Sequence, residues 1–204
     1  MKILGIGNAI VDVICKVEDN FIKENGLTKS TMKLVDENEF KKLLSNLKIE
    51  ETISGGSVAN SIAGLSQLGN KVGFIGKVND DDLGQKYEDG LKKEKVEYFY
   101  SKKKEKLPTG TCLILITPDS ERTMCTFLGT AGKISERDIK KEDIKNSEIV
   151  SSIFKDDSSL LNSISSTNFI VLLVSECLIR NSSETLQSTP TIAFPIPKIF
   201  IKVF

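Results

Sequence analysis

Residues 2–17 read KILGIGNAIVDVICKV, and this stretch decides how the chain folds. It is apolar as far as Ile6, breaks at Gly7-Asn8, and then resumes with β-branched residues. That pattern is typical of a buried strand that continues into a more exposed one. Asp12 interrupts the second strand, and a carboxylate on a buried strand costs free energy unless it forms hydrogen bonds. The stretch therefore predicts two strands in series and makes Asp12 a candidate binding residue.

Asn8 and Asp12 lie four residues apart, so on one extended strand both side chains point to the same side. Two interpretations of Asp12 stay open at this point. It either binds a ligand from the strand, or it caps a turn or faces solvent where the strand ends.

A second polar site follows at Gly55-Gly56, with Asn60 four residues later, at a predicted junction of strand and helix. Two glycines let the backbone approach a ligand, and the first turn of a helix offers free N–H groups. A tight turn is the plainer interpretation of the same two glycines. Because ligands of open α/β sheets bind at the carboxyl ends of strands, both sites could serve one ligand rich in hydroxyl groups, such as a polyol or a nucleoside.

Outward from these sites, predicted strands and helices alternate. Strands are expected at 31–35, 72–78, 96–100, 111–116 and 122–127, and another begins at Ile149-Val150; helices are expected to start at Asp36, after Gly56, at 80–82 and at Ser135. The alternation predicts an α/β fold with a mostly parallel sheet flanked by helices. Consecutive strands near 9–17, 31–35 and 96–127 predict a separate small β-sheet.

Composition excludes several classes of function. With 28 basic and 28 acidic side chains the net charge is zero, so no overall field attracts nucleic acid or an anionic membrane. The absence of histidine excludes Ser-His-Asp hydrolysis, Cys-His proteolysis and His-ligated zinc. No CxxC pair occurs among the four cysteines, which favours reduced, separately buried thiols at Cys15, Cys112, Cys125 and Cys177.

Other short motifs fail on inspection. Polar residues interrupt the N-terminal apolar run where a signal sequence would be continuous, so we expect a cytoplasmic protein. Gly5-Ile6-Gly7 lacks the third glycine of a dinucleotide fingerprint, and the spacing at 129–133 does not match a phosphate-binding loop. The lysine run at 102–104 is expected to be a solvated hairpin tip or sheet edge.

Residues 2–150 resemble the N-terminal half of a ribokinase-like (PfkB-type) carbohydrate kinase, in particular its adenosine-kinase-like branch. Five motifs in the family's order carry the resemblance: Gly5-Ile6-Gly7-Asn8-Ala9-Ile10-Val11-Asp12, Gly55-Gly56-Ser57-Val58-Ala59-Asn60, Phe74-Ile75-Gly76-Lys77-Val78-Asn79-Asp80-Asp81 with Leu83-Gly84, Pro108-Thr109-Gly110-Thr111-Cys112, and Glu121-Arg122-Thr123-Met124. Val58 departs mildly from the family, in which a smaller residue is common.

The resemblance implies an acceptor site and a β lid. Asn8, Asp12, Gly55, Gly56 and Asn60 would bind the hydroxyl groups of a sugar or nucleoside. Strands at 31–35 and 111–127 would form the lid, with Arg122 and Met124 near the pocket and with homodimerisation through the lid as a further expectation. Family members transfer the γ-phosphoryl group of ATP, with Mg²⁺, to a hydroxyl group.

The family's catalytic half is not matched in this sequence. Its glycine-rich segment with the catalytic Asp requires glycines after residue 132, and all 14 glycines lie between Gly5 and Gly132. We therefore expect residues 1–150 to be the N-terminal part of a kinase domain with no catalytic or metal-binding residue of its own. Residues 151–204 are expected to be an atypical tail, in which 11 of the 54 residues are serine.

Two origins of this tail remain open: a shifted or truncated reading frame near residue 150, and a genuine divergent C-terminus that packs on the sheet. The sequence accordingly predicts either kinase ancestry without turnover, a non-catalytic sugar- or nucleoside-binding or dimerisation fragment, or a non-functional product. It does not name the acceptor.

Overall fold

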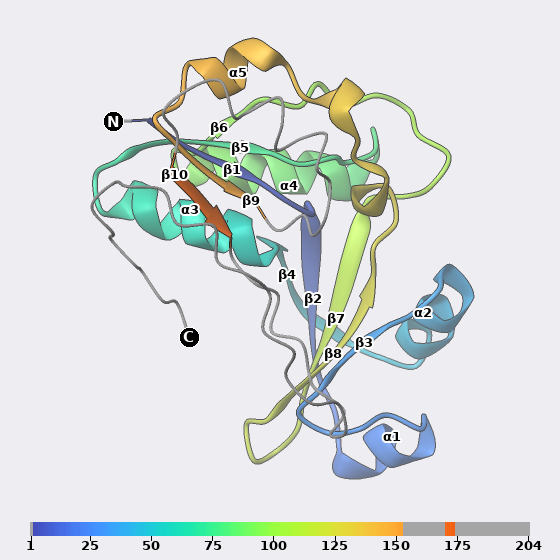
Figure 1. Cartoon of the computed structure of the whole chain (residues 1–204). Coiled ribbons are helices and arrows are strands. Elements are labelled where there is room, and N and C mark those ends of the chain that lie inside the picture. Colours follow the sequence, from blue (N-terminus) through green and yellow to red (C-terminus); the bar gives the residue numbers. More distant parts are fainter. Residues whose placement is uncertain (1, 153–169, 174–204) are drawn as a thin grey trace, which may run out of the picture.

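The computed structural model describes residues 2–152 and 170–173, which form two five-stranded sheets joined end to end (Figure 1). The first sheet is parallel throughout and has the order β10-β9-β1-β5-β6. Its strands are β1 (Lys2–Ile6), β5 (Lys71–Ile75), β6 (Glu97–Tyr98), β9 (Ile149–Ser152) and β10 (Ile170–Leu173). Since all five strands run in one direction, their carboxyl ends meet at one edge of the sheet.

The second sheet, which we call the lid sheet, has the order β3-β8-β7-β2-β4. It consists of β2 (Ile10–Lys16), β3 (Met32–Leu34), β4 (Ile49–Gly55), β7 (Gly110–Ile116) and β8 (Arg122–Phe127). The pairs β2–β4 and β7–β8 are antiparallel, whereas β2–β7 and β3–β8 are parallel. β2 follows β1 after three residues, so the first stretch of the chain supplies a strand to each sheet (Figure 1).

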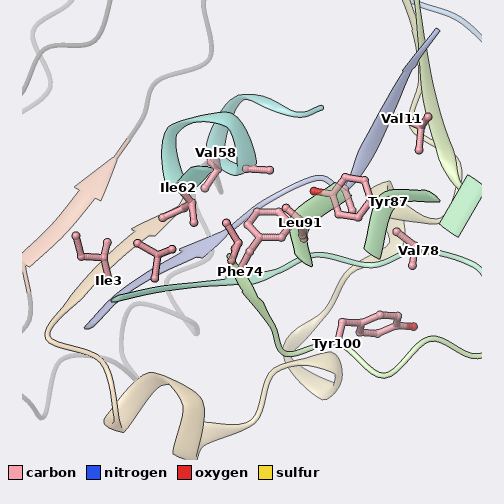
Figure 2. Packing of buried hydrophobic residues seen from close by; sticks show 13 residues of the cluster. Ile3, Val11, Val58, Ile62, Phe74, Val78, Tyr87, Leu91 and Tyr100 are labelled. Atoms are coloured by element: carbon pink, nitrogen blue, oxygen red, sulfur yellow. The ribbon is translucent and has the colours of Figure 1, made fainter. Parts of the chain in front are cut away.

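Helices cover both faces of the parallel sheet. α3 (Ser57–Gln67) and α4 (Asp82–Lys93) pack against one face of this sheet and form a hydrophobic core with it. α5 (Lys141–Lys145) packs on the other face (Figure 1). The shared core holds apolar residues from both sheets, and Figure 2 shows it around Phe74 and Tyr87. Its members are Ile3, Ala9, Val11, Val58, Ala59, Ile62, Val72, Phe74, Val78, Tyr87, Leu91, Val96 and Tyr100.

Among the described residues, two short helices lie on one face of the lid sheet. α1 (Asp19–Glu24) and α2 (Glu37–Leu44) pack against the inward side chains of β2, β7 and β8. Sequence explains the start of α2, because the side chain of Asp36 accepts a hydrogen bond from the Glu39 N–H (2.8 Å). The opposite face carries Asp12 and several exposed apolar side chains, and we call it the open face.

The predicted fold class and lid strands are confirmed, with corrections in detail. The strand expected at 96–100 is reduced to β6 and pairs with β5, so it belongs to the parallel sheet and not to the small one. α1 was not predicted, and β4 was predicted only as a strand without bounds that ends at the Gly55-Gly56 junction. The helix expected from Ser135 is a short 3-10 turn, Glu136–Asp138, with the predicted capping box, and α5 starts three residues after the end of that turn.

Other expectations meet the structure as follows. Cys15, Cys112 and Cys125 are free and buried as predicted, and Cys177 lies outside the described residues. The lysine run at 102–104 is no hairpin tip, since it lies in the segment between β6 and β7, where Lys102 forms an ion pair with Glu88. No helix among the described residues is long and apolar enough to cross a membrane. The origin of the tail, of which 153–169 and 174–204 lie outside the described residues, stays untested.

Candidate acceptor-binding site

Asp12 lies in the middle of β2, where its carboxylate rests against a glycine of the neighbouring strand. In the sheet register Asp12 pairs with Ile53 of β4 and Cys112 of β7. A Cβ atom added to Gly55 would lie 2.2 Å from one Asp12 carboxylate oxygen. Glycine at position 55 is therefore what leaves room for the carboxylate.

Gly56 forms the next contact of the site. Its φ of 98° is a backbone conformation that favours glycine, and a Cβ there would lie 2.6 Å from the carbonyl oxygen of Asn8. Gly56 also begins α3, because its carbonyl accepts a hydrogen bond from the Asn60 N–H at 2.9 Å. The structure thus brings Asn8, Asp12, Gly55 and Gly56 together at the boundary between the two sheets.

The sequence did not predict the element on which Asn8 lies. It lies in the link between β1 and β2, and not on the strand that carries Asp12. The argument from strand alternation is therefore wrong for Asn8. Its proximity to the glycine pair comes from the change of direction between the two strands.

The Asp12 carboxylate is half-buried, and no hydrogen bond or ion pair from the described residues reaches it. Burial raises the pKa of Asp12 to about 6. A carboxylate without partners offers hydrogen-bond acceptors to a ligand, and perturbed acids of this kind cluster at functional sites.

Beneath this site lies a second polar group without a partner, the hydroxyl of Tyr87. Tyr87 is fully buried on α4 and belongs to the same core as Val11, the residue before Asp12 (Figure 2). Within the described part of the chain its hydroxyl is the one buried side-chain polar atom that lacks a hydrogen bond. Burial, with a smaller contribution from the charge of Asp12, raises the pKa of this phenol. Tyr87 could not be recognised as a site residue from the sequence, because it occupies an ordinary apolar position on a helix.

Asn60 is exposed, and it lies at a cleft of about 610 Å³ between the free edge of β4 and helices α3 and α4. Gly55 lines the same cleft, so this glycine connects Asn60 with Asp12. Polar side chains from both helices complete the lining, among them Gln67, Lys86 and Asp89.

Arg122 and Met124 share the open face with Asp12 but lie farther along it. Met124 pairs with Ile114, and Arg122 pairs with Ile116, two strands away from β2. With about 3.3 Å per residue and about 4.8 Å per strand, this register places their Cα atoms about 12 Å and about 16 Å from that of Asp12. The structure therefore places both beside the site and not in contact with Asp12.

The open face around Asp12 is mostly apolar. Ile53, Met124, Met32 and Leu34 are 42%, 36%, 37% and 58% exposed, and by register they lie on the same face as Asp12. Strand alternation along β2 could have revealed this face, since Ile10, Asp12 and Ile14 recur at every second residue. Such a surface suits a ligand that presents hydroxyl groups to Asp12 and an apolar part to the rest of the lid sheet.

A metal site is not part of this arrangement. Among residues 2–152 and 170–173, no three His, Cys, Asp or Glu side chains are grouped closely enough to hold a metal ion.

The known proteins to which this chain is similar are kinases of sugars and related compounds. Residues 2–168 match the family described as pfkB family carbohydrate kinase. The chain is 33% identical over 84 residues to 5-dehydro-2-deoxygluconokinase of Mesomycoplasma hyopneumoniae (strain 232), which covers 41% of this chain and 25% of that protein. It is 38% identical over 74 residues to fructokinase of Escherichia coli, covering 36% of this chain and 24% of that one.

Solved structures show the same likeness. Adenosine kinase from Sinorhizobium meliloti superposes with a TM-score of 0.69 at 32% identity, covering 74% of this chain and 46% of that one. The apo adenosine kinase of Trypanosoma brucei brucei, at 21% identity, shares the fold with a TM-score of 0.71 over 86% of this chain and 58% of that one. The chain thus spans about a quarter of these curated relatives and about half of these solved structures.

Proposed function

This chain belongs to the pfkB family of carbohydrate kinases, and we propose that it forms the acceptor-binding part of such a kinase, holding a sugar or nucleoside whose hydroxyl group is to be phosphorylated. One observation carries the proposal. Within the described part of the chain, the Asp12 carboxylate is half-buried and has no partner, and it rests on Gly55 beside Asn8 and Gly56. Burying a carboxylate in this way is costly unless a ligand satisfies it.

In this proposal each residue has a binding role. Asp12 accepts hydrogen bonds from ligand hydroxyl groups, and the glycine pair lets the sugar approach the backbone at the start of α3. Asn60 adds an amide beside Gly55, whereas Arg122 and Met124 contact the ligand's outer part from the lid sheet. Together these groups would hold and orient an acceptor, which is the main contribution that a protein makes to phosphoryl transfer.

For the acceptor we propose a nucleoside, with adenosine as the first candidate. The apolar open face supports this choice, because a base can pack on apolar side chains while ribose binds Asp12. The likeness at 32% identity to an adenosine kinase structure also supports it. A sugar acceptor is the alternative, favoured by the relatives named 5-dehydro-2-deoxygluconokinase and fructokinase.

We further propose that this chain does not catalyse phosphoryl transfer on its own. The sequence predicts that the glycine-rich turn and its catalytic Asp are missing, and ATP with Mg²⁺ would act through that segment. A second candidate is a non-catalytic fragment that forms a homodimer through the lid sheet, which the exposed apolar residues of the open face favour. A cytoplasmic location, the absence of a nucleic-acid partner and the domain boundary at residue 150 stay predictions.

Calorimetry of the purified chain with adenosine, ribose and fructose tests the proposal. We expect adenosine to bind, with at least a hundredfold loss of affinity in Asp12→Ala. Asp119→Ala is the matched control, because Asp119 is an exposed carboxylate in the loop between β7 and β8. Equal affinities of the wild type and Asp12→Ala would remove Asp12 from the site. An ATP-consumption assay with each acceptor should show no turnover, and phosphorylation that Asp12→Ala abolishes would refute that part.

A further inference from the structure

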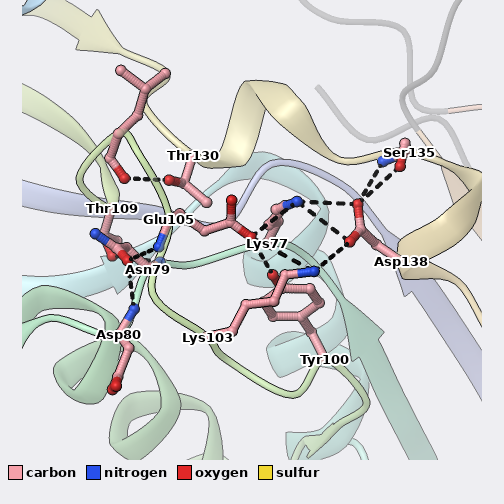
Figure 3. A network of polar contacts seen from close by, with 11 residues as sticks. Lys77, Asn79, Asp80, Tyr100, Lys103, Glu105, Thr109, Thr130, Ser135 and Asp138 are labelled. Carbon is pink, nitrogen blue, oxygen red and sulfur yellow. Dashed lines mark hydrogen bonds and ion pairs between the residues drawn. The ribbon is translucent and has the colours of Figure 1, made fainter.

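Within residues 2–152 and 170–173, four chain segments cross between the parallel sheet and the lid sheet. They are residues 7–9, Gly56, residues 99–109 and residues 128–148, which follow β1, β4, β6 and β8. Polar contacts gather on the last two crossings, at the carboxyl end of β5 (Figure 3).

Lys77 is at the centre of these contacts. It follows β5 by two residues and is only 7% exposed. Its Nζ atom lies 3.2 Å from a carboxylate oxygen of Glu105 and 3.3 Å from both carboxylate oxygens of Asp138. Glu105 belongs to the third crossing and Asp138 to the fourth. One buried cation therefore joins both crossings to the parallel sheet.

Neighbouring groups complete the cluster. The Tyr100 hydroxyl donates to Glu105 (3.3 Å), and the Ser135 N–H and hydroxyl both donate to Asp138 (3.0 Å). Lys103 lies 3.8 Å from each of the two carboxylates. Burial alone would raise the pKa of Asp138, but the Ser135 hydrogen bonds and Lys77 outweigh burial and lower it. Asp138 is thus held as a fully partnered anion.

A second group of hydrogen bonds fixes the same crossings. Asp81, the N-cap of α4, accepts from the Thr109 N–H (2.9 Å) and hydroxyl (2.6 Å). The Asn79 side chain accepts from the Glu105 N–H at 2.7 Å. Between the two crossings, the Thr130 N–H donates to the Pro108 carbonyl at 2.9 Å. The Thr130 hydroxyl donates to the Leu107 carbonyl (Figure 3).

The first two crossings have no such cluster in the described structure. They consist of Gly7-Asn8-Ala9 and Gly56, and the side chain beside them, Asp12, has no partner. These two crossings are instead held by close backbone packing: the Gly7 N–H donates to the Ile75 carbonyl at 3.0 Å, and Gly56 leaves no room for a Cβ atom beside the Asn8 carbonyl.

We propose that Lys77 is a positioning residue: through Glu105 and Asp138 it holds the third and fourth crossings together, and with them the position of the lid sheet relative to the parallel sheet. The anchoring itself does not depend on the proposed function. Its consequence for the acceptor does, because any lid movement then changes the position of Asp12 relative to Asn8.

Amide hydrogen exchange measured by NMR tests the anchoring without any ligand. In Lys77→Met we expect at least tenfold faster exchange at Glu105, Thr109 and Ile139, with the amides of β1 and β5 unchanged. Lys77→Arg should restore protection, because it keeps the charge. Lys33→Met is the matched control, since it removes a lysine that pairs with Glu39 inside the lid unit, at 2.6 Å.

A second variant keeps the test decisive if Lys77→Met does not fold. Glu105→Gln should speed exchange at the third crossing only, because Lys77 still pairs with Asp138. Exchange that is unchanged in these variants, or that rises equally in β1 and β5, would overturn the proposal. Because these measurements use no adenosine, a failure of the proposed function leaves them valid. If adenosine binds, its affinity should fall about tenfold in Lys77→Met and stay unchanged in Lys33→Met.

Discussion

Two carboxylates at the boundary between the sheets, Asp12 and Asp138, have opposite surroundings. Asp138 is bonded to Lys77 and Ser135, and its pKa is lowered. Asp12 has no partner among the described residues, and burial raises its pKa to about 6. A satisfied carboxylate stabilises a junction, whereas an unsatisfied one lowers stability and leaves its oxygens for a ligand. The comparison supports the proposal that the Lys77 end of the boundary holds the structure and that the Asp12 end binds the ligand.

Alanine at Gly56 should have the largest effect on stability. The positive φ strains any L side chain, and the new Cβ would press on the Asn8 backbone. We expect Gly56→Ala to lower the free energy of unfolding by about 2–4 kcal/mol. Gly64→Ala, in the interior of α3 with no atom near its added Cβ, should instead raise it by about 0.5–1 kcal/mol. Urea unfolding measures both, and equal effects would contradict the tight approach at Gly56.

Asp81→Ala, at the end of the boundary near Lys77, should lower the free energy of unfolding somewhat less than Gly56→Ala does. It removes the N-cap of α4 and both hydrogen bonds from Thr109. A loss of about 2–3 kcal/mol is expected from these contacts. Asp82→Ala, one residue later on the exposed first turn of α4, should cost about 0.5 kcal/mol and serves as the control. Similar losses in the two variants would mean that Thr109 is not held through Asp81.

Asp12→Asn should stabilise the ligand-free chain. The folded pKa of about 6 exceeds the ordinary value of 3.8, so ionisation of Asp12 opposes folding and stability falls as the pH rises from about 4 to about 6. By urea unfolding we expect a gain of about 3 kcal/mol at pH 7.5, which shrinks to about 0.5 kcal/mol at pH 4. Asp138→Asn should show the opposite sign at pH 7.5, because its folded pKa is lowered. A loss of stability in Asp12→Asn at pH 7.5 would point to a partner for this carboxylate.

Tyr87→Phe should have the smallest effect, a gain of about 1 kcal/mol, since it removes a buried hydroxyl without a partner. Tyr98→Phe is the matched control on the same core. The Tyr98 hydroxyl donates to the Gly76 carbonyl at 2.5 Å, and its removal should cost about 1 kcal/mol. Thermal unfolding of the three proteins measures the difference. A destabilised Tyr87→Phe would reveal a hydrogen bond at this hydroxyl.

Much of the fold could be predicted from local pattern. Caps at Asp36, Asp81 and Ser135, together with alternating apolar strands, predict most of the elements, because these signals lie within a few residues of each other. Local pattern could not predict that β6 belongs to the parallel sheet. Two residues of strand carry almost no pattern, and their pairing with β5 depends on the packing of α4.

The site could be predicted only in part. The glycine pair and Asp12 stand out, because each breaks a local rule for strands. The side of the chain on which Asn8 lies, the apolar open face and the contacts of Lys77 depend on residues far away in sequence. Glu105 is 28 residues and Asp138 is 61 residues from Lys77, so no local pattern connects them.

The order of pairing also constrains how the protein can be made. β1 pairs with strands at 71–75 and 149–152, while β2, next to it in the chain, pairs with strands at 49–55 and 110–116. As the ribosome releases the chain, neither sheet can be completed before much of the other has been synthesised. Such long-range interleaving slows folding and leaves no place to cut the gene into two independently folding halves.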